Sequence, residues 1–279
     1  MTPFPVTEIC QVLRIARRTT YYVARARLDG RYHRRSDPMV LEQIRAVTNS
    51  RATYAYRRVW AMVNRTFRTR YNRKRIRRVM QLNGLMLAPR VHRRHGRPHL
   101  GQIRQPASNQ RWCSDVFLLP CWSLEVLSVV FAIDCHDREV FAWTASPRPL
   151  TGADIRTLMD KALWARFGEA TLKAPPAIQW LSDNGPQYTA TATVLYAHGL
   201  GLVPITTPAY SPESNGLAEA FVGTFKRDYV DGAELQDAES VLAQLGRWIE
   251  DYNTQAPHSA LGMRSPAAYR AEGTLSSSR

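Results

Sequence analysis

The chain has 279 residues, a formal net charge of +15 and an apolar content of 44%, which suit a globular protein with one mid-sized core and a smaller module. No stretch approaches the roughly 20 apolar residues of a membrane span, and the N-terminus lacks a signal peptide's apolar segment. The four cysteines show no CxxC spacing, which favours free thiols in a cytoplasmic protein over a disulfide framework.

The positive charge is concentrated in the first part of the chain. Residues 1–110 contain 25 Lys and Arg, all arginine except Lys74, against four acids, which gives +21, whereas residues 111–279 give −6. A segment with this excess of charge binds a polyanion by releasing its counterions. A solvated basic face is the alternative, but the concentration in one segment and the preference for Arg favour nucleic acid.

Residues 1–37 are predicted to form a segment like a helix-turn-helix. Apolar residues from Val6 to Leu13 have helical spacing, and a break at residues 14–16 precedes a second helical stretch that carries Arg17 and Arg18. The alternative is a basic helical hairpin without a role in DNA binding.

Residues 38–87 are predicted to form a basic module of three helices, over about 39–49, 54–66 and 72–84. In the third helix Asn72 is a candidate N-cap and Gly84 a candidate C-terminal stop. The arginines and the lysine on the outer faces of the second and third helices are candidate DNA-binding residues: Arg57, Arg58, Arg73, Lys74, Arg75, Arg77 and Arg78.

Residues 88–110 lack periodicity and contain Pro, Gly and Arg, so they are predicted to be an extended basic linker. Three histidines in this segment, with Cys113 nearby, raise the alternative of a structural zinc site. The paired cysteine spacing of such a site is missing and zinc needs four ligands, which favours the linker.

From Arg111 the pattern changes to strands, over 111–120, 126–135 and about 139–146. Helices and strands then alternate: a helix at about 151–168, a strand at 177–182, a helix at 189–200 and a strand at 202–206. A long helix at about 237–253 follows. A three-strand meander followed by alternating helices and strands is the order of a ribonuclease-H-like α/β core, which we place at 111–272. Residues 273–279 are Ser-rich and predicted to be a disordered tail.

The stretch from Ser211 to Tyr229 is predicted to be an amphipathic helix whose polar side carries Asn215, Glu219 and Lys226. Thirty-five residues separate Glu219 from Asp183, which follows a short strand, and Asp115 lies further upstream within the first strand. Three carboxylates carried on a strand, a strand end and a helix can hold two divalent metal ions for phosphoryl transfer.

These motifs resemble those of the DDE transposase and retroviral-integrase superfamily, and in particular the second-reading-frame (OrfB) transposases of bacterial insertion sequences. The resemblance covers roughly residues 6–270. The residues that carry it are Trp112 with Asp115, the SDNGPQY and SPESNGLAEAF motifs, and a C-terminal block of short motifs, DYN, ALG and SPAAY. Single motifs are weak signals, but their order and the 35-residue gap are specific.

The resemblance implies that Asp115, Asp183 and Glu219 are the catalytic metal ligands, with Mg²⁺ as the natural ion and Mn²⁺ as a substitute. It also implies that Lys226 contacts the DNA end, and Asn215 on the same polar side is a further candidate. Asp134 and Asp137 compete with Asp115, and Glu213 competes with Glu219. We favour Asp115 and Glu219 because their spacings match the family, and we interpret Asp134 as structural or as a support for the ligands.

The implied function is a transposase that cuts and joins element-end and target DNA, acting as a homo-oligomer. The upstream-frame product is a further expected partner, as a fusion, and no membrane is involved. A DNA-binding regulator without catalysis and a metal-dependent nuclease of the ribonuclease-H type are the alternatives. The first would show a broken acid triad, and the second would not need the +21 segment.

Overall fold

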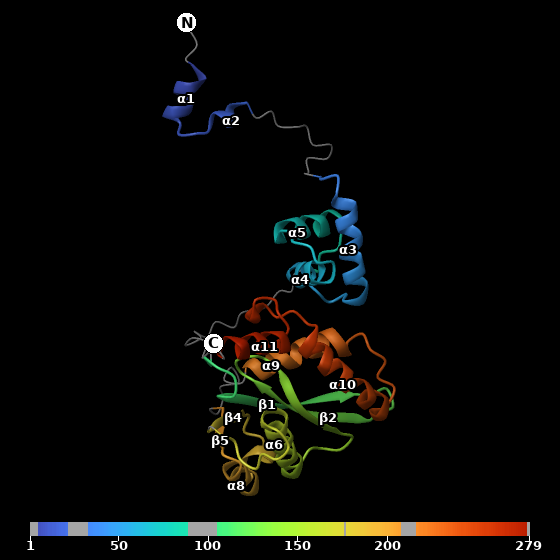
Figure 1. Ribbon diagram of the computed structural model, residues 1–279. Helices are drawn as coiled ribbons and strands as arrows, with labels where there is room; N and C mark the ends of the chain where they lie inside the picture. Colours follow the sequence, from blue (N-terminus) through green and yellow to red (C-terminus); the bar gives the residue numbers. More distant parts are fainter. Residues whose placement is uncertain (1–4, 22–32, 89–104, 176, 208–215, 278–279) are drawn as a thin grey trace. The chain divides into compact units, whose positions relative to one another are not determined.

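The computed structural model describes residues 5–21, 33–88, 105–175, 177–207 and 216–277 (Figure 1). The chain divides into two compact units, residues 1–42 and 43–279. The finer boundaries expected at residues 37, 87 and 110 stay a prediction. In the parts of the chain that the structure describes, no helix is long and apolar enough to cross a bilayer.

The first unit contains two short helices, α1 (Val6–Val12) and α2 (Arg17–Thr20). The break between them falls where the sequence predicts it, and Arg14 there has a positive φ of 49°. Arg17 and Arg18 are exposed on α2. Helix α3 (Asp37–Ser50) spans the boundary between the units.

Helices α4 (Tyr56–Thr66) and α5 (Arg73–Leu82) pack on each other, in agreement with the predicted helical module. Their shared core contains only apolar side chains: Val59, Val63, Ile76, Val79 and Met80. The Asn72 side chain caps α5 by accepting a hydrogen bond from the Lys74 backbone at 2.8 Å, which satisfies one unpaired donor of the first turn. Most of the predicted linker, residues 89–104, lies outside the described residues.

The segment from residue 111 onwards is built on a five-stranded mixed sheet in the order β3-β2-β1-β4-β5. The strands are β1 (Arg111–Pro120), β2 (Val126–Asp134), β3 (Val140–Ser146), β4 (Ile178–Ser182) and β5 (Leu202–Thr206). The first three run antiparallel, and β1, β4 and β5 run parallel. This confirms the ribonuclease-H-like order, with helices on both faces of the sheet.

One face of the sheet is covered by α6 (Gly152–Phe167) and α8 (Thr191–Gly199). The single helix predicted at 189–200 is preceded by a separate short helix, α7 (Pro186–Thr189), because Ala190 between them is extended at φ −55° and ψ 131°. Trp112 is fully buried on this side, with its ring 6.3 Å from that of Trp180. Figure 1 shows this layer opposite α9 and α10.

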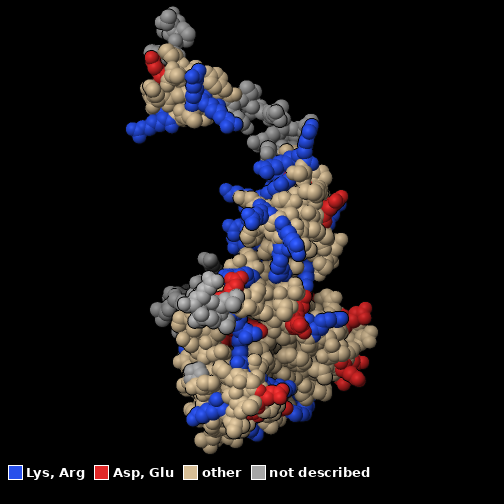
Figure 2. All heavy atoms as spheres, viewed as in Figure 1, with Lys and Arg blue, Asp and Glu red and all other residues tan. Residues whose placement is uncertain are grey.

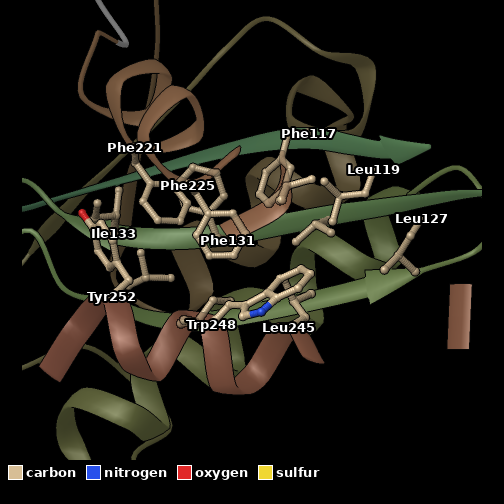
Figure 3. Close-up of a cluster of buried hydrophobic side chains, with 14 of the residues drawn as sticks. Phe117, Leu119, Leu127, Phe131, Ile133, Phe221, Phe225, Leu245, Trp248 and Tyr252 are labelled. Carbon is tan, nitrogen blue, oxygen red and sulfur yellow. The ribbon is translucent and has the colours of Figure 1, made fainter. Parts of the chain in front are cut away.

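The other face is covered by α9 (Gly216–Phe225) and α10 (Ala238–Thr254), and its core is rich in aromatic rings (Figure 3). Helix α9 continues directly into a π-helical turn, η2 (Lys226–Val230). A 3₁₀ turn, η3 (Ser259–Leu261), and α11 (Pro266–Ser277) end the described chain. The expectation of a disordered tail from residue 273 is therefore wrong as far as Ser277, because the helix continues through those residues.

Within the second unit, polar contacts connect α4 and the turn before it with η2 and α10. The Arg58 guanidinium forms an ion pair with Asp228 at 2.5 Å and lies 3.6 Å from the centre of the Tyr54 ring. Arg51 forms a bidentate ion pair with Asp251, at 2.6 and 2.5 Å. The sequence predicted that Arg58 faces solvent for DNA. That orientation is wrong, because a partner 170 residues away in sequence holds the side chain.

The aromatic core predicts a large loss of stability on removal of Phe225. The side chain is fully buried and its ring contacts those of Phe117, Phe221 and Trp248. Phe225→Ala should lower the free energy of unfolding by about 3–5 kcal/mol, measured by urea denaturation. The matched change Leu242→Ala, at a side chain 40% exposed on α10, should cost less than about 1 kcal/mol. Equal losses for the two variants would contradict this packing.

Candidate active site

Two of the three predicted acids lie on neighbouring parallel strands. In the register of β1 and β4, Cys113 is opposite Leu181, so two residues further along Asp115, in the middle of β1, lies level with Asp183, just past the end of β4. Asp183 directly follows β4, and its Oδ1 accepts a hydrogen bond from the Gly185 backbone at 3.0 Å. The carboxyl ends of strands in α/β sheets are where ligands collect.

The third acid comes from α9, whose position is fixed by aromatic packing. Across the sheet Asp115 pairs with Phe131, and the Phe131 ring lies 4.5 Å from that of Phe221, two residues after Glu219 (Figure 3). Ala218 and Phe221 face the core, whereas Glu219 between them is exposed. The helix therefore places Glu219 on its polar side, above the strand that carries Asp115.

The pKa of Asp115 shows that the three carboxylates share one environment. This pKa is raised to about 6, mainly by partial burial, although the Val116 backbone N–H donates to the carboxylate at 2.8 Å and opposes the rise. The negative charges of Asp183 and Glu219 contribute to the rise, because like charges disfavour ionisation. The pKa of Asp115 therefore depends on the charges of both other predicted acids.

The three carboxylates are suitable ligands for Mg²⁺ or Mn²⁺, because both cations prefer oxygen ligands. In the described residues no three acidic, His or Cys side chains form a ready set of metal ligands as they stand. Asp115 and Asp183 each use one oxygen to accept a local backbone hydrogen bond. Small side-chain rotations would redirect these oxygens, and the mutual repulsion of the carboxylates would be relieved by cations between them.

Lys226 lies on the same side of β1 as Asp115. Its ammonium is 5.9 Å from the centre of the Phe117 ring, and Phe117 and Asp115 are two apart on one strand face. Lys226 is also the first residue of the π-helical turn η2, an irregularity that recurs at functional sites. Asn215, predicted on the same polar side of the helix, lies outside the described residues.

The competing acids have different surroundings. Asp134 is fully buried, and its carboxylate accepts hydrogen bonds from the backbone N–H groups of residues 109, 136 and 137. Asp137 is fully buried in an ion pair with Arg166 at 3.2 Å. Both carboxylates are thus occupied in holding the turn between β2 and β3. Glu213 lies outside the described residues.

Tyr188 is a residue near the site to which the sequence assigned no role. Its hydroxyl and that of Ser114 are 2.7 Å apart in a buried hydrogen bond that connects α7 to β1 next to Asp115. Burial raises the pKa of Tyr188, Ser114 lowers it, and the charges of Asp115 and Asp183 raise it again. The SDNGPQY motif contained this tyrosine, but only the fold reveals its partner.

The basic candidates of α4 and α5 differ in accessibility. Figure 2 shows Lys and Arg side chains gathered over α3 to α5 on the visible face. Arg57, Arg73, Lys74 and Arg77 are exposed, whereas Arg75 and Arg78 are half-buried. Together with the excess of charge in this part of the chain, these exposed side chains form a surface suited to a polyanion.

Comparison with known proteins agrees with this geometry. Residues 105–212 and 200–266 match the family described as integrase core domain, and residues 35–95 match the HTH-like domain. Transposase InsD for insertion element IS2A/D/F/H/I/K of Escherichia coli is 39% identical over 274 residues, which cover 95% of this chain and 90% of that protein. The chain belongs to the transposases of bacterial insertion elements.

Two further proteins are similar to this chain over only part of their own length. A 48.2 kDa protein of insertion element IS2A from Escherichia coli is 39% identical over 278 residues, and the chain spans only 65% of that relative's length. A structure of the simian T-cell lymphotropic virus intasome in complex with PP2A regulatory subunit B56 gamma contains a chain similar in fold, at a TM-score of 0.50 and 15% identity. The match covers 82% of this transposase and 74% of that chain.

The raised pKa of Asp115 predicts a pH-dependent stability. Below about pH 3 the carboxyl is largely protonated in both the folded and the unfolded chain, since its ordinary pKa is 3.8. As pH rises towards 6 the unfolded chain loses this proton first, so ionisation increasingly destabilises the fold. In EDTA at pH 8, Asp115→Asn should therefore unfold at a higher denaturant concentration than the parent, and at about pH 3 the two should coincide. A variant less stable than the parent at pH 8 would contradict the repulsion among the carboxylates.

Proposed function

We propose that the chain cuts and joins DNA ends by metal-dependent phosphoryl transfer, with Asp115, Asp183 and Glu219 as the metal ligands. The observation that carries this proposal is that the pKa of Asp115, on a central strand, responds to the charges of both other acids. A carboxylate whose pKa is raised by burial and by neighbouring acids, next to the end of a parallel strand, is a candidate catalytic group.

These three carboxylates would hold two divalent ions, which would supply activation of a water or 3′-hydroxyl and stabilisation of the leaving oxygen. The residues of this chain would supply the rest. Asp115 and Asp183, on adjacent strands, would hold one side of the site, and Glu219 on α9 would close it. Lys226 would bind a phosphate next to the cut and so position the DNA strand for in-line attack.

DNA binding is the expected role of the basic helical segment. The matching HTH-like domain covers α3, α4 and α5, and the exposed basic side chains of α5 would contact phosphates and so fix the protein on the duplex. We further propose that the transposase acts on DNA as a homo-oligomer, that it can be fused to an upstream-frame product, and that it associates with the nucleoid. The intact set of three acids argues against a regulator without catalysis.

Removing any one of the three carboxylates should abolish catalysis without preventing DNA binding. Asp115→Asn, Asp183→Asn and Glu219→Gln each keep the side-chain shape but remove a charge that holds the cations. Each variant should lower the rate of strand transfer by at least about 100-fold, which corresponds to about 3 kcal/mol of lost transition-state stabilisation. The assay combines element-end DNA, Mg²⁺ and a target plasmid. Glu239→Gln, at an exposed acid of α10, is the matched control and should stay active. Full activity of any of the three would show that the wrong acids were chosen.

The exposed basic residues of α5 should set the salt dependence of DNA binding. Each phosphate contact contributes about −0.9 to the slope of log K against log salt, so Arg73→Ala/Lys74→Ala/Arg77→Ala should make the slope shallower by up to about 3. Fluorescence anisotropy with duplex DNA at several salt concentrations measures it. A matched triple alanine variant of basic residues in the core segment, at Arg148, Lys161 and Lys173, should change the slope less. The opposite ranking would place the DNA surface elsewhere.

Lys226 should matter for the DNA end and not for the cations. Lys226→Ala should weaken productive end binding and strand transfer, while Mn²⁺ binding measured by calorimetry stays as in the parent. Lys226→Arg should recover much of the loss, because a phosphate accepts either cation. If Lys226→Ala transfers strands as well as the parent at physiological salt, the lysine serves only to cover Phe117.

A further inference from the structure

Two cysteines that are 22 residues apart in sequence lie in contact next to the candidate active site. The Sγ atoms of Cys113 and Cys135 are 3.1 Å apart, and both residues are free thiols. Cys113 lies on β1 and is 1% exposed, whereas Cys135 directly follows β2 and is half-buried. A disulfide has an S–S length of about 2.05 Å, so the sulfurs need to approach by only about 1 Å.

The backbone around both cysteines is held in place. The Cys135 N–H donates to the Arg111 carbonyl at 3.0 Å, which extends the pairing of β1 with β2 by one residue. The next turn is fixed by the buried Asp134 carboxylate, which accepts from the backbone of residues 109, 136 and 137. The two thiols are therefore not brought together by a mobile loop but are presented to each other by the sheet.

This pair adjoins the residues proposed to bind the cations. Side chains two apart on a strand share a face, so Cys113 and Asp115 lie on the same side of β1. Cys113 is also opposite Leu181 of β4, two residues before Asp183. A movement of the Cys113 backbone is thus transmitted directly to the strand segments that carry both acids.

We propose that Cys113 and Cys135 form a modification site for hydroperoxides, whose disulfide reversibly slows the cutting and joining of DNA. The half-buried Cys135 reacts first: its sulfur takes one oxygen from the hydroperoxide and becomes a sulfenic acid, and the rest of the oxidant leaves as water or an alcohol. The buried Cys113 sulfur then attacks the Cys135 sulfur, the S–S bond forms, the S–O bond breaks, and the hydroxyl leaves as water with the Cys113 proton. In total the two thiols lose two electrons and two protons.

The expected effect on activity follows from the geometry. Catalytic groups need placement within roughly 0.5 Å, and a misplacement of about 1 Å can cost about 100-fold. Closing the S–S distance by about 1 Å next to Asp115 should therefore lower strand transfer at least about 10-fold, and dithiothreitol should restore it. This part of the inference rests on the proposed function, whereas formation of the disulfide does not.

The test uses the full chain with the other two cysteines removed, as Cys10→Ser/Cys121→Ala, so that only this pair remains. The protein is treated with hydrogen peroxide and then digested with trypsin and Glu-C. Trypsin alone leaves both cysteines on one peptide, but cleavage after Glu125 separates them, so a linked peptide pair in the mass spectrum shows the disulfide. Strand transfer is measured before oxidation, after oxidation and after dithiothreitol.

The inference predicts the linked peptides together with a loss of activity that dithiothreitol reverses. Cys135→Ser in the same background should be as active as the reduced protein and should keep its activity in peroxide; Cys113→Ala should behave in the same way. No linked peptide, or a linked peptide with unchanged activity, would overturn the inference. A reduced protein without any strand transfer would instead refute the proposed function, and the linked peptides would still decide whether the modification site exists.

Discussion

The contact between the Phe131 and Phe221 rings is the interaction on which the arrangement of the site depends. Two of the acids are fixed by β1 and β4 within the sheet, but Glu219 belongs to a helix that reaches the sheet only through packing. The ring contact at 4.5 Å, extended by Phe225 against Phe117, sets where that helix lies along β1 (Figure 3). Aromatic rings bury large areas in specific geometries, so the helix has little freedom to shift.

Charge organises the rest of the molecule around that contact. The core segment is slightly acidic and places three mutually repelling carboxylates in one region, and bound cations would relieve this repulsion. The N-terminal part has a large positive excess, which draws DNA towards the protein. Not all of these basic side chains face solvent. Arg51 and Arg58 form ion pairs with Asp251 of α10 and Asp228 of η2, and so connect α4 and the turn before it with the helices that follow Glu219.

Much of the fold could be predicted from the sequence because the signals are local. The strands of the core segment have strongly apolar stretches bounded by turns, and β1 and β5 have the predicted limits. The N-cap of α5 is likewise a local signal, and Asn72 makes the expected hydrogen bond. Asp115 stood out because an aspartate within a strand is unusual, and the apolar periodicity predicted the helix that carries Glu219. The family resemblance supplied the choice of Asp183 and Glu219 as its partners.

What could not be predicted depends on contacts between residues distant in sequence. Arg58 has the periodicity of a solvent-facing residue, and nothing near it in the sequence reveals Asp228. The π-helical turn at Lys226 has no signal in the pattern of apolar residues, which stays helical through Phe225. The proximity of Cys113 and Cys135 requires the register of β1 with β2, which the sequence alone does not fix.

The most direct test of this account is the position of Mn²⁺ in crystals of the transposase, measured by anomalous scattering. The account predicts anomalous peaks about 2 Å from carboxylate oxygens of Asp115 and Asp183, with Glu219 completing the site, and a separation of about 3.5–4 Å if two ions bind. Peaks at Asp134 or Asp137, with none between Asp115 and Asp183, would contradict it.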